Sequence, residues 1–294
     1  MGTGKILITG ATGDTGGYAI DRLLEQGREV RALAHAKDER SERFRGRGVE
    51  VVYGDLLDFG QVRAALDGVR RAYFVYPIRP GILQATAYFA QAAKEAGIDG
   101  IVNMSQKSAR EDAKSHAATD HWLSERVFDW SGVPTVHIRP TYFAEWLLYL
   151  APMIRAGRLH VPFGTGKHAP IAAEDQGRVI AGLLEDPAAH AGRIYPLFGP
   201  VEYTYEETAQ LLSRALGTDV QYKQVDFEEF SKWQQASGKN AGRDNSFLFQ
   251  HLREVAIDHQ DGIFAGTNDL VEKLGGRPPM TLEAFIEKHK PAFV

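Results

Sequence analysis

The stretch Ile8-Thr9-Gly10-Ala11-Thr12-Gly13-Asp14-Thr15-Gly16-Gly17 decides the fold of this chain. It follows an apolar run, Lys5–Thr9, and precedes a segment of helical period, Gly17–Gln26. Glycines three residues apart allow a tight turn, let the backbone approach a pyrophosphate and let a helix pack closely on a strand. Unpaired N–H groups at the start of that helix favour an anion. The stretch therefore predicts a dinucleotide site, and the alternative is a glycine-rich turn without a ligand. The candidate contacts in it are Gly10, Thr12, Gly13, Asp14, Thr15 and Gly16.

Strand-like and helix-like segments alternate through the first half of the chain. The further apolar runs are Glu29–Ala34, Val49–Tyr53, Arg71–Tyr76, Gly100–Met104 and Thr135–Arg139. Such alternation predicts an α/β fold with a doubly wound parallel sheet, the Rossmann arrangement. We expect residues 1–155 to form this domain, completed by a strand near 193–198, and residues 156–294 to form a smaller α+β substrate domain.

The second half contains fewer strand signals. Glu174–Glu185 and Thr204–Leu216 are expected to be helices, and Thr281 is a plausible N-cap of a last helix. The segment Ser237–Asn245, rich in Gly, Asn and charge, is expected to be a mobile loop.

Composition excludes several classes of protein. The chain has 294 residues, of which 44% are hydrophobic, and its formal net charge is −4. A mildly acidic chain is a poor nucleic-acid binder, so we expect no nucleic-acid partner. With no cysteine, disulfides, thiolate zinc sites and a cysteine nucleophile are excluded. No secretion signal or membrane span is visible, and we expect a cytoplasmic protein without a membrane partner.

The end of the second expected strand indicates which dinucleotide is bound. NAD selection usually needs a carboxylate there for the ribose 2′-hydroxyl. Here the strand ends without one, and His35 and Lys37 are available to face a 2′-phosphate. We therefore expect NADP(H) to be favoured over NAD(H), although both side chains are alternatively solvated loop residues. Asp55 is a candidate partner for the adenine amino group, with a helix N-cap as its alternative role.

Motifs along most of the chain match one family. They are Gly10-Ala11-Thr12-Gly13 with Gly16, Val30-Arg31-Ala32-Leu33, Gly54-Asp55-Leu56, His121-x-x-x-Glu125 before Ser131-Gly132-Val133-Pro134, Arg139-Pro140 followed by Phe143, Gly199-Pro200 before Tyr205, and Gly276-Arg277-Pro278-Pro279-x-Thr281-Leu282-x-x-Phe285. The chain resembles the NmrA-like branch of the atypical short-chain dehydrogenases/reductases. The resemblance implies a Rossmann domain, a smaller C-terminal domain and a substrate cleft between them. It implies either an NADPH-dependent reductase of quinones, dyes or other unsaturated compounds, or a cofactor-sensing regulator without turnover.

The usual acid catalyst of the wider superfamily, a Tyr-x-x-x-Lys pair, is absent. None of the 11 tyrosines is followed by lysine four residues later, and Ala117 and His121 occupy the matching positions. We therefore expect direct hydride transfer to an electron-poor small molecule, a quinone, dye or imine. The resemblance implies that His121 contacts the nicotinamide ribose; the alternative is a surface histidine paired with Glu125.

The remaining candidate site residues lie at or beyond the ends of the expected third, fourth, fifth and sixth strands. Ser105 and Tyr142 are the candidate catalytic residues, and Tyr76 and Lys107 are other proton sources. Each has a plainer role, as pocket wall for the tyrosines and as surface charge for the lysine. The candidate cofactor contacts in this group are Leu56, Tyr76, Pro77, Ser105, His121, Pro140, Tyr142 and Phe143. No metal site is expected, because no His-Glu-x-x-His pattern occurs.

Overall fold

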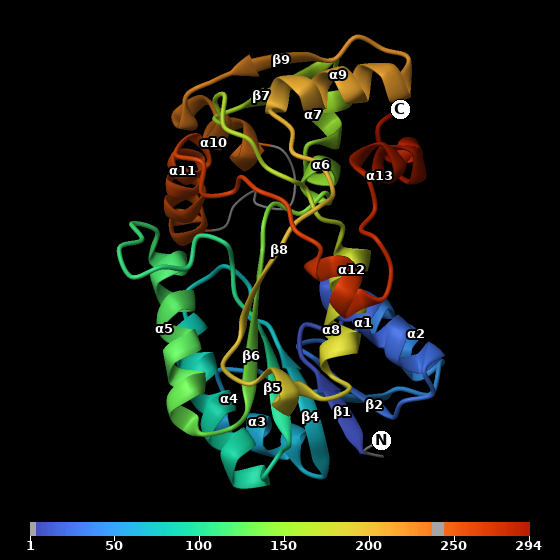
Figure 1. Cartoon of the computed structure of the whole chain (residues 1–294), viewed down its shortest axis with the longest axis vertical. Helices are drawn as coiled ribbons and strands as arrows, with labels where there is room; N and C mark the ends of the chain where they lie inside the picture. Colours follow the sequence, from blue (N-terminus) through green and yellow to red (C-terminus); the bar gives the residue numbers. More distant parts are fainter. Residues whose placement is uncertain (1–3, 237–243) are drawn as a thin grey trace.

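A seven-stranded sheet forms the lower part of the molecule in Figure 1. The computed structural model describes residues 4–236 and 244–294. The strands of this sheet are β1 (Lys5–Ile8), β2 (Val30–Ala34), β3 (Glu50–Tyr53), β4 (Val69–Phe74), β5 (Gly100–Met104), β6 (Thr135–Pro140) and β8 (Ile194–Leu197). Their order is β3-β2-β1-β4-β5-β6-β8, and every neighbouring pair is parallel. The predicted doubly wound parallel sheet is confirmed.

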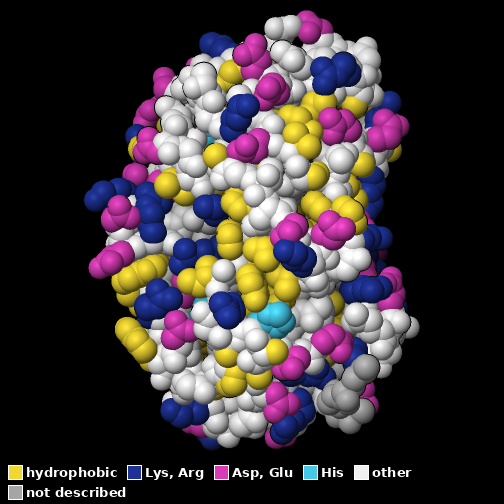
Figure 2. Space-filling view, in the orientation of Figure 1, with side chains coloured by type: hydrophobic (Ala, Val, Ile, Leu, Met, Phe, Trp, Pro, Cys, Tyr) yellow, Lys and Arg dark blue, Asp and Glu magenta, His cyan; other side chains and the backbone are white. Residues whose placement is uncertain are grey.

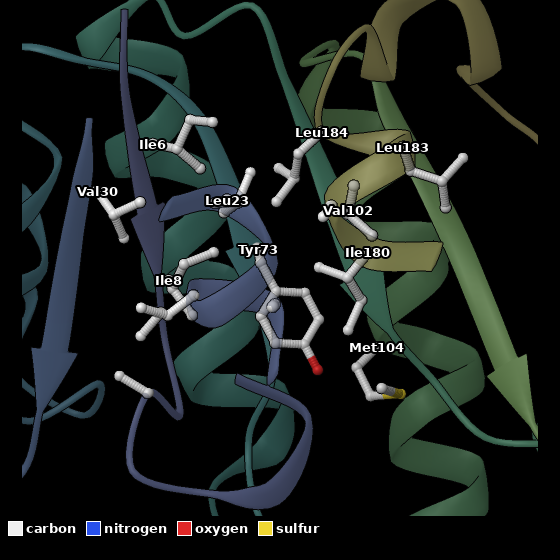
Figure 3. Close-up of a cluster of buried hydrophobic side chains, with 14 of the residues drawn as sticks. Ile6, Ile8, Leu23, Val30, Tyr73, Val102, Met104, Ile180, Leu183 and Leu184 are labelled. Carbon is white, nitrogen blue, oxygen red and sulfur yellow. The ribbon is translucent and has the colours of Figure 1, made fainter. Parts of the chain in front are cut away.

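Helices cover both faces of the sheet, which explains why its strands are apolar on both sides. The helices α1 (Asp14–Glu25), α2 (Glu39–Arg45) and α8 (Ala173–Leu183) share one buried cluster with the sheet, and α12 (Leu270–Gly275) packs on α8. The helices α3 (Phe59–Leu66), α4 (Ile82–Ala96) and α5 (His116–Ser131) cover the other face. Figure 3 shows the first cluster, where Ile8 and Tyr73 meet Leu23 and Ile180.

A second buried cluster forms the upper part of the molecule (Figure 1). Its short sheet pairs β7 (Arg158–Val161) in parallel with β9 (Gln221–Gln224). The helices around it are α6 (Trp146–Tyr149), α7 (Ala151–Arg155), α9 (Tyr205–Leu216), α10 (Phe227–Ala236), α11 (Ser246–Gln260) and α13 (Leu282–Lys288). Two 3-10 turns, η1 (Pro187–His190) and η2 (Lys290–Ala292), complete the described elements.

The ends of two helices follow the sequence closely. Thr281 caps α13 by accepting from the Ala284 N–H at 3.1 Å, as predicted, and Thr204 caps α9 in the same way. Residues 237–243, the greater part of the expected mobile loop, lie outside the described residues.

The chain passes between the two parts more than once. After α6 and α7 have joined the upper cluster, α8, β8 and α12 return to the sheet. The expected division at residue 155 therefore stays a prediction about folding units. In the view of Figure 2, acidic and basic side chains are interspersed, and hydrophobic side chains gather across the middle of the face.

Candidate functional site

The strand order places a site at the carboxyl ends of β1 and β4. Neighbouring crossovers run in opposite directions there, and ligands of open α/β sheets bind at such a point. The glycine stretch occupies this position. Gly10 has a φ of +57°, and its carbonyl accepts from the Gly13 N–H at 2.9 Å, which closes the turn. A Cβ at Gly16 would lie 2.4 Å from the Gly10 carbonyl oxygen, so Gly16 serves close packing.

The start of α1 is open to a ligand. Its N-cap, Gly13, makes no side-chain capping hydrogen bond, so the first N–H groups of α1 have no side-chain cap. The Thr15 hydroxyl instead lies 2.9 Å from the hydroxyl of Tyr73 inside the core. A backbone cradle whose N–H groups face a cavity fits a diphosphate.

A single cavity of about 880 Å³ connects this cradle with the upper part of the molecule. The predicted residues that line it are Gly10, Thr12, Gly13, Asp14, Thr15, His35, Asp55, Leu56, Tyr76, Pro77, Ser105, His121, Pro140, Tyr142 and Phe143. Gly16 and Lys37 are not among the lining residues. The structure therefore gathers nearly all the candidate contacts into one space.

The end of the cavity beside β2 and β3 carries His35, Arg40 and Asp55. Arg40 lies at the start of α2, where its guanidinium donates to the Asp38 carboxylate at 2.7 Å. The alternative role of Asp55 as an N-cap is wrong, because Asp58 caps α3 and Asp55 accepts from the Leu57 N–H. Arg40 is not among the candidates from the sequence, and the structure brings it to the site.

The opposite end contains unpaired polar atoms. The Ser105 hydroxyl, in a residue only 3% exposed, and the Gln106 side-chain nitrogen have no hydrogen-bond partner among the described residues. Buried polar atoms normally have partners, so these two mark a place where a polar ligand completes the structure. Together with the cradle at Gly13, they fit a nicotinamide dinucleotide along the cavity.

His121 is buried rather than exposed. Its interpretation as a surface partner of Glu125 is wrong, because the Glu125 carboxylate accepts from Nε and Nη2 of Arg139, at 2.7 and 2.6 Å. Burial, reinforced by nearby His251, lowers the pKa of His121 to about 4. The His121 ring is thus neutral at pH 7 and borders the cavity as a hydrogen-bonding group.

The expected proton sources differ in their surroundings. The Tyr76 hydroxyl donates to the Pro80 carbonyl at 3.2 Å and accepts from Arg79. Lys107 is half-buried rather than a surface charge, and burial lowers its pKa. The Tyr142 ring packs against Phe264 at 4.8 Å, while its hydroxyl is buried without a hydrogen-bond partner among the described residues.

We predict that Tyr142→Phe leaves the turnover of any substrate within about two-fold of the wild type. Burial raises the pKa of the Tyr142 hydroxyl well above its usual value, which makes the group a poor acid. The ring contacts with Phe163 and Phe264 remain in the variant. Steady-state kinetics check this expectation, and a loss of 100-fold or more in kcat would show that Tyr142 is the acid catalyst.

Sequence reasoning missed one whole wall of the cavity. Leu248, His251, Leu252 and Val255 line it from α11, and Phe264 follows in the next segment. These α11 positions recur with the spacing i, i+3, i+4 and i+7, the pattern of one helix face, so a signal was present. Trp146 and Tyr149, from α6, border the same space.

Over residues 4–236 and 244–294, no group of three or more His, Asp or Glu side chains is arranged to hold a metal ion. No helix in the same ranges combines the length and the apolar character needed to cross a bilayer.

Comparison with known proteins gives a family and several similar chains. The profile of the NmrA-like family matches residues 2–270. An NAD(P)H azoreductase of Xenophilus azovorans is 31% identical over 291 residues, covering 98% of this chain and 99% of that protein. The NADPH complex of a quinone oxidoreductase from Escherichia coli superposes with a TM-score of 0.84 at 24% identity, covering 97% and 99% of the two chains. A Citrobacter sp. triphenylmethane reductase in complex with NADP(H) gives 0.83 at 23% identity, covering 96% and 99%.

Proposed function

The chain belongs to the NmrA-like family, and we propose that it is an NAD(P)H-dependent reductase of electron-poor small molecules. The substrate class is a quinone, dye or imine, as the names of the similar azoreductase and quinone oxidoreductase suggest. One observation carries the proposal: a continuous cavity joins the glycine cradle to an aromatic wall, so a cofactor and a planar substrate fit end to end.

The chain's own residues have separate tasks in this proposal. A reduced nicotinamide supplies hydride when it is bound. The N–H groups at Gly13 and the start of α1 hold the diphosphate, and the Ser105 hydroxyl positions the nicotinamide end. Phe143, Trp146 and Phe264 exclude water from the reacting face. No tyrosine–lysine pair is needed, because an acceptor with a low-lying empty orbital accepts hydride without prior protonation.

We further propose a preference for NADP(H), carried by Arg40 and His35 rather than by Lys37. Arg40→Ala is expected to raise the Kd for NADPH by about ten-fold, since a charge-assisted hydrogen bond contributes on the order of 1.5 to 3 kcal/mol. The Kd for NADH should change by less than two-fold. Titration of the cofactor fluorescence measures both values.

Two variants make this test specific. Arg43→Ala removes a guanidinium from the same helix but outside the cavity, and it should leave both Kd values unchanged. Lys37→Ala tests the prediction from sequence directly. A loss of NADPH affinity in Lys37→Ala but not in Arg40→Ala would reverse our assignment.

The proposed reaction is tested by mixing the protein and NADPH with a panel of quinones, azo dyes and imines. We expect the absorbance of the reduced cofactor to fall with at least one acceptor class. Tight cofactor binding without turnover of any acceptor would instead identify a sensor of the dinucleotide.

A further inference from the structure

We propose that His251 donates a hydrogen bond to the substrate's acceptor atom, the carbonyl oxygen or azo nitrogen on which negative charge develops. This inference rests on the proposed reductase function and deepens it. No motif in the sequence pointed to His251, which enters the cavity from the C-terminal half of the chain on α11.

His251 is held firmly at the site. The helix α11 stands against the start of α5 (Figure 1). Gln250 accepts from the His116 N–H and donates to the Lys114 carbonyl, each at 2.9 Å. Arg110 binds the Asp258 carboxylate through both terminal nitrogens, at 2.9 and 2.7 Å. These contacts lie on either side of His251 along α11 and fix the helix that carries it.

Ser115 engages one nitrogen of the His251 ring. The Ser115 oxygen caps α5 by accepting from the Ala118 N–H at 3.1 Å. The same oxygen lies 2.7 Å from His251 Nδ1. A serine hydroxyl has one hydrogen and two lone pairs, so Ser115 is able to donate to Nδ1 while its oxygen accepts from the Ala118 N–H. In the proposed arrangement Ser115 donates to Nδ1, and the proton of the neutral ring resides on Nε2.

The Nε2–H group is available to a ligand. Within residues 4–236 and 244–294, no hydrogen bond engages Nε2, although the residue is only 7% exposed. Burial lowers the pKa of His251 to about 4, so the ring is a neutral donor at pH 7. His121 is also buried, neutral and on the cavity wall. The ring of His251 thus presents a donor to the space beside the aromatic wall.

The chemistry of the acceptor explains the need for a donor. Hydride, which carries two electrons, passes from the dihydronicotinamide to one atom of the conjugated acceptor. The π-bond pair of that acceptor shifts to the distal oxygen or nitrogen. The reduced nicotinamide becomes the oxidised form, and a proton from water later neutralises the distal atom. A fixed N–H group stabilises the charge during this step without itself being deprotonated. His251 thereby supplies part of what the absent Tyr-x-x-x-Lys pair would provide.

A spectroscopic experiment tests the inference without turnover. The protein labelled with ¹⁵N is saturated with NADP⁺, and 2-methyl-1,4-naphthoquinone is added as the probe. The histidine ¹⁵N shifts should show the Nε2–H tautomer for His251 before addition, and its Nε2–H resonance should move on addition. The signal is assigned by its loss in His251→Gln. An Nδ1–H tautomer, or a resonance that does not respond to the quinone, would overturn the proposal.

Kinetics with NADPH and the same quinone give an independent readout. His251→Leu should lower kcat about 100-fold with little change in KM, the effect of losing one donor in the transition state. His251→Gln retains an N–H donor at a similar position and should recover most of the rate. His116→Leu replaces an exposed histidine at the same helix contact and is the matched control. Unchanged NADPH affinity in each variant confirms an intact cofactor site.

The outcomes separate this inference from the proposed function. If the wild type reduces the quinone and His251→Leu keeps its kcat, or changes only in having a higher KM, then the reductase function stands and the role of His251 is refuted. If the wild type reduces no acceptor, the proposed function fails, and the response of the Nε2–H resonance alone decides whether His251 binds the quinone.

Discussion

Gly13→Val is expected to abolish dinucleotide binding while the protein remains folded. The φ of Gly13 is −89°, a value that any residue adopts. A Cβ there would meet only the Gly10 carbonyl oxygen, at 3.2 Å, and the rest of the side chain would project into the cavity. The branched side chain would then occupy the space through which a diphosphate reaches the amides of α1. We expect the Kd for NADPH to rise by on the order of 100-fold or more, about 3 kcal/mol.

Calorimetry measures this loss, and thermal unfolding shows whether the fold survives. Gly17→Ala is the control, because its added Cβ would lie 3.7 Å from the nearest atom, in ordinary contact, and Gly17 does not line the cavity. That variant should bind NADPH normally and gain up to about 1 kcal/mol of stability, since alanine favours a helix over glycine. Normal NADPH binding by Gly13→Val would show that the glycine cradle does not hold the diphosphate.

The fold could be predicted because its signals are local. Ile6, Leu7 and Ile8 are fully buried in β1, and an apolar run between a lysine and a glycine turn is typical of a strand covered on both faces. The fourth strand shows the limit of this reasoning. It was expected at Arg71–Tyr76 but runs Val69–Phe74, because Val69 pairs with Lys5 and starts the ladder earlier. Pairing partners, which a local pattern does not contain, set the ends of strands.

The site was predictable only where it lies next to the glycine stretch or at strand ends. The cavity wall formed by α11 depends on how this helix docks against α5. The two helices are more than 100 residues apart in the chain, and no local pattern specifies their contact. Ser115 and His251 illustrate the difficulty, since each is an unremarkable polar residue until the fold brings them within 2.7 Å. Arg40 was not predictable for the same reason, because the placement of α2 brings it to the cavity.

Glu125 gives the second large expected effect, on stability. The family motif contains this glutamate, and the structure explains its position by the Arg139 guanidinium, which donates to both of its oxygens. The Glu125 side chain is fully buried, and that of Arg139 is 19% exposed. The pair joins α5 to β6, and Pro140, the residue after Arg139, lines the cavity.

We predict that Glu125→Leu lowers the free energy of unfolding by about 3 to 5 kcal/mol, because it leaves the Arg139 charge largely buried without its partner. The double variant Glu125→Leu/Arg139→Met should be less destabilised than the single one, since both charges are then absent. Denaturant unfolding measures the difference. Glu25→Ala, which breaks the exposed pair with Arg22, is the control and should cost less than about 1 kcal/mol. Equal losses in Glu125→Leu and the double variant would show that the carboxylate contributes by its shape and not by pairing with Arg139.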